Sequence, residues 1–200
     1  RNLIANIVQL REWSRFHVTE SSETVLTALP MYHIFALTIN FLAFLSMGQR
    51  MILVPKPIPI ENLIKTFKKH PEITVLTGVN TLFNALVNHP EFKAVAPKNL
   101  RCAMAGGMML QVAVAKQWIE ATNCPIIEGY GLSEASPTTH SNPLDDRYRL
   151  GSIGIPIPST ECKIVDDDDC EVAPGEVGEL CIRGPQVMKG YWNRPDESAT

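Results

Sequence analysis

Short apolar runs alternate with helical patterns from residue 23 to residue 143. The apolar runs predict strands, and the segments with apolar residues at helical spacing predict helices. The predicted strands are Thr24–Leu29, Arg50–Val54, Thr74–Thr77, Leu100–Ala105 and Pro125–Ile127. The predicted helices are Ile34–Met47, Ile60–Lys69, Thr81–Val87 and Leu110–Ala121. This alternation predicts an α/β fold, a parallel sheet with helices on both faces, in which successive strands point the same way.

The pattern changes after Pro143, where glycine and proline become frequent and strand patterns follow without helices. The acidic run Asp166–Asp169 in this part predicts a polar hairpin turn, because it lacks the spaced ligands and the closing glutamate of a calcium loop. We therefore expect residues 1–149 to form an α/β subdomain and residues 150–200 to begin a β-rich, barrel-like lobe.

Composition and charge are those of an ordinary globular chain, with 45% hydrophobic and 20% charged residues and a net charge of −3. No dense basic run favours nucleic acid as a partner. The longest apolar stretch, Ile34–Met47, is shorter than the roughly 20 residues of a membrane-spanning helix. Thr38 and Asn40 interrupt this stretch, so it predicts a buried helix that ends at Gly48. Five cysteines without a C-x-x-C pair predict reduced, mostly buried thiols in a cytosolic protein.

Loops rich in glycine or small polar residues leave the carboxyl ends of three predicted strands. These loops are Gly78–Asn80, Ala105–Gly107 and Glu128–Ser136. Ligands of an open parallel sheet bind beyond these strand ends, and glycine lets backbone N–H groups approach them closely. In the third loop, Tyr130 offers a ring for a base, Ser133 a hydroxyl for a phosphate, and Glu134 an oxygen ligand for Mg²⁺. The three loops together predict a nucleotide site.

The main alternative is a serine hydrolase with Ser133 as nucleophile, since "GLSEA" is similar to the G-x-S-x-G elbow. That elbow needs a helix directly after the serine, but Pro137 follows four residues later. His140 also lies too close in sequence to follow a separate acid. A non-catalytic module that binds a nucleotide or a lipid is the third interpretation. A dinucleotide fingerprint is excluded, because "GYGLSE" has Glu134 in place of its third glycine.

The third loop, "EGYGLSEASP", resembles the adenylate-forming family, which includes acyl-CoA synthetases, luciferases and the adenylation domains of peptide synthetases. Further matching segments follow the family order: "ALPMYHIFAL", "AGGMML", "GSIGIPIPSTECKIVD" and "GELCIRGPQVMKGYWNRPDESAT". The resemblance covers essentially the whole chain and is closest to bacterial long-chain fatty acyl-CoA ligases. Two departures are Ser133, where the family often has threonine, and Met108-Met109, where Ala-Pro is common.

This resemblance implies a fragment of the large N-terminal domain of an acid–thiol ligase. A fatty acid and ATP would give an acyl-adenylate and pyrophosphate, and coenzyme A would then displace AMP. The implied ligands are ATP or AMP, Mg²⁺, coenzyme A and a fatty acid, in a cytoplasmic enzyme. Peripheral contact with the inner membrane and a homodimer are left open by the sequence.

The resemblance also implies roles for individual residues. Glu134 would hold Mg²⁺, Ser133 the α-phosphate, and His33 would lie near the carboxylate and the entry of coenzyme A. The implied nucleotide-binding residues are Gly106, Gly107, Glu128, Gly129, Tyr130, Gly131, Leu132 and Ser133. The implied acyl-substrate residues are His33, Leu37, Gly78, Val79, Ala105 and Gly131.

The two ends of the chain indicate that the sequence is part of a longer protein. The chain starts at Arg1 without a methionine and stops at Thr200, which predicts an internal piece of a longer protein. By the resemblance, the phosphate loop would end just before Arg1, and the ribose-binding aspartate would follow Thr200. The catalytic lysine would belong to a separate C-terminal domain. We therefore expect these 200 residues alone to form no acyl-adenylate.

Overall fold

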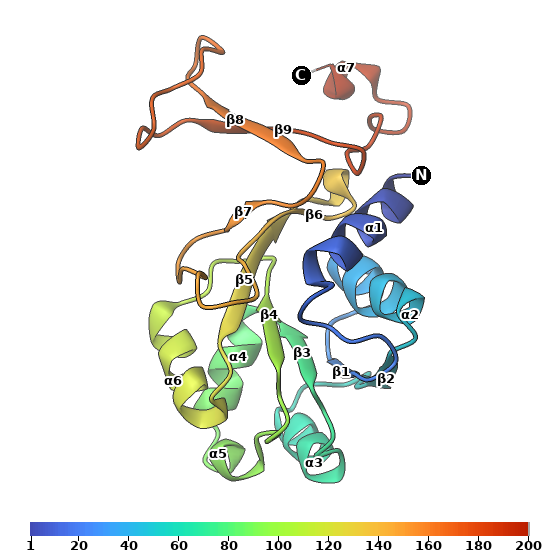
Figure 1. The fold of residues 1–200 in the computed structure, drawn as a ribbon, viewed down its shortest axis with the longest axis vertical. Helices are drawn as coiled ribbons and strands as arrows, with labels where there is room; N and C mark the ends of the chain where they lie inside the picture. Colours follow the sequence, from blue (N-terminus) through green and yellow to red (C-terminus); the bar gives the residue numbers. More distant parts are fainter. Residues whose placement is uncertain (200) are drawn as a thin grey trace.

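A computed structural model describes residues 1–199, and its main feature is a seven-stranded sheet with helices on both faces (Figure 1). The strands are β1 (Thr24–Thr27), β2 (Arg50–Leu53), β3 (Val75–Gly78), β4 (Cys102–Ala105), β5 (Ile126–Gly131), β6 (Thr138–Ser141) and β7 (Ile155–Pro156). They lie in the order β2-β1-β3-β4-β5-β6-β7. β1 to β5 are parallel, which confirms the predicted fold class.

The region after Ile127 differs from the prediction, which placed a loop from Glu128 to Ser136. β5 instead continues to Gly131, and β6 returns beside it in the antiparallel direction. A Cβ on Gly131 would lie 2.1 Å from the carbonyl oxygen of Pro137, so only glycine fits this close return. The sequence of β6, Thr-Thr-His-Ser, has no apolar residue, so hydrophobic periodicity could not detect it.

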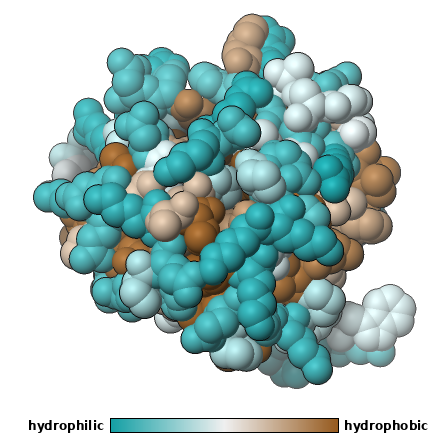
Figure 2. Space-filling model, turned by 90° about the horizontal axis from the view of Figure 1, so that it is seen from below, coloured by the Kyte–Doolittle hydropathy of each residue, from teal (hydrophilic) through white to brown (hydrophobic). Residues whose placement is uncertain are grey.

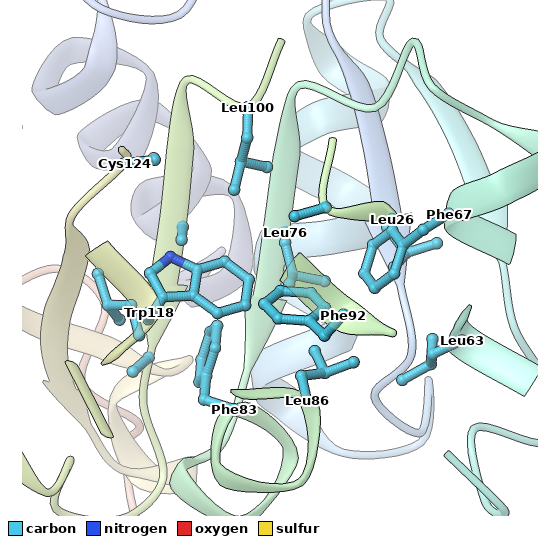
Figure 3. Close-up of a cluster of buried hydrophobic side chains, with 14 of the residues drawn as sticks. Leu26, Leu63, Phe67, Leu76, Phe83, Leu86, Phe92, Leu100, Trp118 and Cys124 are labelled. Atoms are coloured by element: carbon cyan, nitrogen blue, oxygen red, sulfur yellow. The ribbon is translucent and has the colours of Figure 1, made fainter. Parts of the chain in front are cut away.

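Four helices cover one face of the sheet. They are α3 (Glu61–Lys69), α4 (Asn80–Val87), α5 (Phe92–Val95) and α6 (Val112–Thr122). Trp118 is fully buried at their centre, edge-on to Phe83 at 4.9 Å and stacked with Phe92 at 5.3 Å between ring centroids (Figure 3). Leu26 and Leu76 from the sheet join this core. Seen from below, hydrophilic side chains dominate the outer surface, with apolar areas between them (Figure 2).

The other face of the sheet packs against α1 (Asn2–Ser14) and a helix that lies where Ile34–Met47 predicts one. This helix is a π-helix, η1, over Ala36–Ala43 and an α-helix, α2, over Phe44–Ser46. It ends at Gly48, whose φ of +68° suits glycine. Within residues 1–199, no helix is long and apolar enough to span a bilayer.

The polar residues that interrupt the apolar stretch attach η1 to the sheet. Asn40 is fully buried, and its Nδ2 donates hydrogen bonds to Thr27 Oγ1 at 3.0 Å and to Thr77 Oγ1 at 2.6 Å. Thr27 and Thr77 belong to the neighbouring strands β1 and β3. One amide therefore satisfies two buried hydroxyls and fixes the rotation of η1 about its axis.

Side-chain amides also hold α1 in place. The Asn6 side chain is fully buried and forms a two-way pair with the Thr138 backbone, donating to the carbonyl at 2.9 Å and accepting from the N–H at 3.1 Å. One turn on, Gln9 Nε2 donates to Pro158 O at 2.7 Å and to Gln186 Oε1 at 3.0 Å. α1 thus joins the main sheet to a segment near the end of the chain.

The last part of the chain forms a separate two-stranded antiparallel sheet of β8 (Glu161–Val165) and β9 (Glu179–Arg183), followed by α7 (Pro195–Ser198). The acidic run forms the predicted turn, since Asp166 N–H donates to the Cys170 carbonyl at 2.9 Å. The division between residues 1–149 and 150–200 stays a prediction, and Thr200 lies outside the described residues.

The cysteines correct one expectation from the sequence. All five are free, but only Cys124 is buried, while Cys162 and Cys170 are exposed. The prediction of mostly buried thiols was wrong because Cys162 lies on β8, a strand that is largely exposed on both faces, and Cys170 lies at the end of the exposed acidic turn.

This difference in burial predicts selective alkylation of the thiols. Cys102 is only half-buried as a residue, but burial of its thiol raises the pKa of this group to about 12, and burial raises the pKa of Cys124 to about 11, so both stay protonated at pH 8. We expect iodoacetamide at pH 8 to label Cys162 and Cys170 first, as read by peptide mass spectrometry. Equal labelling of all four under native conditions would contradict the burial described here.

The Asn6 pair predicts a specific loss of stability. Asn6→Ala would leave the N–H and carbonyl of Thr138 buried without partners. We expect the free energy of unfolding in urea to fall by about 2–3 kcal/mol. Asn88→Ala is the matched control, because the Asn88 amide bonds only to exposed groups of its own helix. Equal effects of the two substitutions would mean that the buried pair adds nothing.

Candidate functional site

A cavity of about 310 Å³ lies between the sheet and the helices α1, η1 and α2. Its interior is mainly apolar, with Trp13 from α1, Ile39 and Ala43 from η1, and Met104 from β4. Its rim is formed by the segments at the carboxyl ends of β4 and β5. One continuous space therefore joins an apolar interior to a rim rich in glycine and hydroxyl groups.

Most of the residues expected at the site lie together at this cavity. Those that line it are His33, Ala105, Gly106, Gly107, Gly129, Tyr130, Gly131, Leu132 and Ser133. Those that do not line it are Leu37, Gly78, Val79, Glu128 and Glu134. The first group comes from three separate parts of the chain, and the fold brings them together.

The glycines of the rim allow its two loops to approach each other. Gly106 N–H donates to the Gly78 carbonyl at 3.3 Å, and a Cβ on Gly106 would lie 3.2 Å from the Phe35 ring and 3.6 Å from Gly129 O. Gly107 has φ +77°, a left-handed conformation that favours glycine. Gly78 itself lies behind this contact, buried against Leu82 and Phe83.

Glu128 faces away from the cavity and has a structural partner. Its carboxylate accepts a hydrogen bond from Gly151 N–H at 2.7 Å, and its carbonyl accepts one from Asn142 N–H at 2.9 Å. Burial raises the pKa of this carboxyl group. The side chain thus joins β5 to the loop before β7.

Tyr130 lines the cavity, with its ring packed edge-on against the buried ring of His140 on β6. The ring centroids are 6.2 Å apart with an interplanar angle of 62°. Burial lowers the pKa of His140, so its ring is neutral at physiological pH. A neutral partner at its edge leaves the face of the Tyr130 ring suited to stacking on a base.

Ser133 and Glu134 lie on η2 (Ser133–Ala135), a single 3₁₀ turn at the rim. The Glu134 carboxylate accepts a hydrogen bond from the Tyr191 hydroxyl at 2.6 Å, and its carbonyl accepts one from Met188 N–H at 2.7 Å. The Tyr191 hydrogen bond lowers the pKa of Glu134, which keeps the group ionised at neutral pH. Sequence reasoning did not identify Tyr191, because this contact spans 57 residues and no local pattern indicates it.

The oxygen ligands at this turn suit Mg²⁺, which is bound partly by substrate. They do not suit a metal ion that is bound by protein side chains alone. Within residues 1–199, no group of three or more His, Cys, Asp or Glu residues could hold a metal. Glu134 supplies one ionised carboxylate next to the cavity, and the preceding residue, Ser133, is exposed and lines the cavity. Mg²⁺ is typically bound by one or two carboxylates together with substrate phosphates and water, and one carboxylate near a nucleotide site matches this coordination.

The geometry around Ser133 speaks against a hydrolase. A nucleophile elbow turns directly into a helix, whereas η2 ends at Ala135, two residues after Ser133, and the chain then enters β6. His140 is buried, and its Nδ1 lies 3.0 Å from Thr139 Oγ1. In the described residues, no histidine is hydrogen-bonded to Ser133 to act as its base.

Comparison with known proteins agrees with this geometry. The family of AMP-binding enzymes matches residues 1–192. A long-chain-fatty-acid–CoA ligase from Salmonella typhimurium is 50% identical over 196 residues, covering 98% of this chain and 35% of the relative. A ligase of the same name from Bacillus subtilis is 39% identical over 200 residues, covering 100% of this chain and 35% of the relative.

Solved structures give the same relationship. The crystal structure of ATP-bound MatB from Rhodopseudomonas palustris matches with a TM-score of 0.89 and 27% identity, over 99% of this chain and 38% of that one. The chain spans about a third of the length of the curated relatives, 35% in each case above. The match over residues 1–192 confirms the resemblance seen in the motifs, and the chain belongs to the family of AMP-binding enzymes.

Proposed function

We propose that the protein carrying this chain is a long-chain fatty acid–CoA ligase that forms AMP. The observation that carries this proposal is the single cavity that joins an apolar interior to a rim of glycines, Tyr130 and Ser133. The names of the relatives support it. A cytoplasmic location stays a prediction, as do contact with the inner membrane and a homodimer.

The rim would hold the nucleotide. The face of Tyr130 would stack on adenine, and the backbone of Gly106 and Gly107 would approach it from the other loop. The Ser133 hydroxyl, exposed at the rim, would donate a hydrogen bond to an α-phosphate oxygen. Glu134 would bind Mg²⁺, which when bound neutralises the phosphate oxygens and stabilises the pyrophosphate that leaves.

In the first step, a carboxylate oxygen of the fatty acid attacks the α-phosphorus, and the bond to pyrophosphate breaks. In the second, the thiol of coenzyme A loses its proton to water and its sulfur attacks the acyl carbonyl carbon, and the bond from that carbon to the phosphate oxygen breaks as AMP leaves. His33 lies at the cavity, and its Nδ1 accepts a hydrogen bond from Phe35 N–H at 3.2 Å. Because Nδ1 accepts this hydrogen bond, Nε2 is the ring nitrogen that would donate to the acyl carboxylate.

The apolar interior would hold the acyl tail. Burying one methylene group contributes roughly 0.8 kcal/mol, so a 16-carbon tail could contribute on the order of 10 kcal/mol at most. Only a deep apolar space can collect that free energy. The helices η1 and α2 and the residue Trp13 supply such a lining beyond the rim.

The full-length protein provides the direct test of this function. Incubation with ATP, Mg²⁺ and palmitate, without coenzyme A, should exchange labelled pyrophosphate into ATP. Glu134→Ala should slow this exchange by roughly 10²–10³, the scale for losing one group that stabilises charge in the transition state. Absence of exchange with short, medium and long acids would contradict the proposal.

A second prediction concerns the length of the acyl chain. Ile39→Trp places a larger side chain in the cavity lining, which shortens the space for the acyl tail. The preferred acid should therefore shift to a shorter chain. The measurement is the exchange rate across saturated acids of increasing length. Leu37→Trp, on the same helix but outside the lining, is the matched comparison. If the preferred chain length shifted in Leu37→Trp but not in Ile39→Trp, the acyl tail would not lie in this cavity.

A further inference from the structure

We propose that Tyr191 is a positioning residue that holds the Glu134 carboxylate in the orientation that binds Mg²⁺. This inference rests on the proposed function, since it concerns the metal of the nucleotide step. Its basis is the 2.6 Å hydrogen bond from the Tyr191 hydroxyl to Glu134 Oε1.

The arrangement around the carboxylate suits this role. Tyr191 donates to one oxygen, Oε1, and no other side chain within residues 1–199 donates a hydrogen bond to this carboxylate. A carboxylate that binds a metal through one oxygen is commonly hydrogen-bonded through the other, which fixes the plane of the group. A neutral phenol hydroxyl can supply this bond without adding a positive charge that would repel the cation.

The backbone that carries Tyr191 is itself held against η2. Met188 N–H donates to the Glu134 carbonyl at 2.7 Å, so the two segments meet through main chain as well as side chain. Tyr191 N–H donates to Ser198 Oγ at 2.8 Å, which ties the residue to α7. Tyr191 therefore reaches Glu134 from a supported segment, as a positioning residue requires.

The same segment is anchored in the interior of the protein. Gln186 is fully buried, and its Nε2 donates to Thr160 Oγ1 at 2.7 Å while its Oε1 accepts from Gln9. Asn2 Nδ2 donates to the Val187 carbonyl at 2.7 Å. These bonds limit how far the Tyr191 hydroxyl can move away from the carboxylate.

The opposite role makes a different prediction. In that role, the Tyr191 hydroxyl competes with Mg²⁺ for the Glu134 carboxylate, and its hydrogen bond must break when the metal binds. Removal of the hydroxyl would then strengthen Mg²⁺ binding, whereas removal of a positioning group weakens it. The direction of the change therefore separates the two roles.

The experiment measures ATP binding to the full-length protein by calorimetry, without Mg²⁺ and with saturating Mg²⁺. The readout is the factor by which Mg²⁺ tightens ATP binding. Tyr191→Phe should reduce this factor about 10- to 100-fold, the usual cost of losing a group that supports a metal ligand. Trp192→Phe is the matched control in the same segment, since Trp192 is 89% exposed, and it should leave the factor within about twofold.

A double-mutant cycle identifies the route of the effect. In a Glu134→Ala background, Tyr191→Phe should cause no further change, because the two residues act as one unit. An equal loss in both backgrounds, an unchanged or larger factor in Tyr191→Phe, or no effect of Mg²⁺ on the wild-type protein would each overturn the inference. The ligase function is judged separately, by palmitate-dependent exchange in the wild-type protein.

Discussion

The antiparallel pairing of β6 with β5 is the interaction on which the candidate site depends. In a purely parallel sheet the chain would leave β5 through a loop into a helix. Here it returns at once, with Gly131 pressed against the Pro137 carbonyl, and this return supports the short turn that bears Ser133 and Glu134. The same strand offers its Thr138 backbone to Asn6, so the first helix of the chain is held by it as well.

Hydrophobic patterns were sufficient to predict the parallel part of the fold. The runs around Val25, Leu76 and Ile126 are apolar because those strands are covered on both faces, and this makes them visible in the sequence. The β6 strand is also buried, but its own residues are polar. Its sequence therefore has no apolar pattern that could reveal it. The π-helical turns of η1 were also beyond prediction, since apolar spacing indicates a helix but not its hydrogen-bond register.

The candidate site also combines features that the sequence predicted with features that it did not. Many of the residues in the short motifs lie together at one cavity, because two of the motifs follow neighbouring parallel strands whose carboxyl ends share an edge. The motifs could not tell that Glu128, one residue before Gly129, turns to the opposite side and bonds to Gly151. This segment was predicted as a loop rather than a strand, so the direction of each side chain could not be assigned from the sequence. Tyr191 was missed for a different reason, since its partner lies 57 residues earlier.

The amides of α1 have a consequence for the order in which the molecule can assemble. Asn6 bonds to a strand 132 residues later in sequence, and Gln9 to a side chain 177 residues later. During synthesis α1 leaves the ribosome before these partners, so its polar side chains can bond to them only after the partners have emerged. Until then α1 lacks these hydrogen bonds, so the cavity that it helps to enclose reaches its final form only after β6 and the segment of Gln186 have emerged.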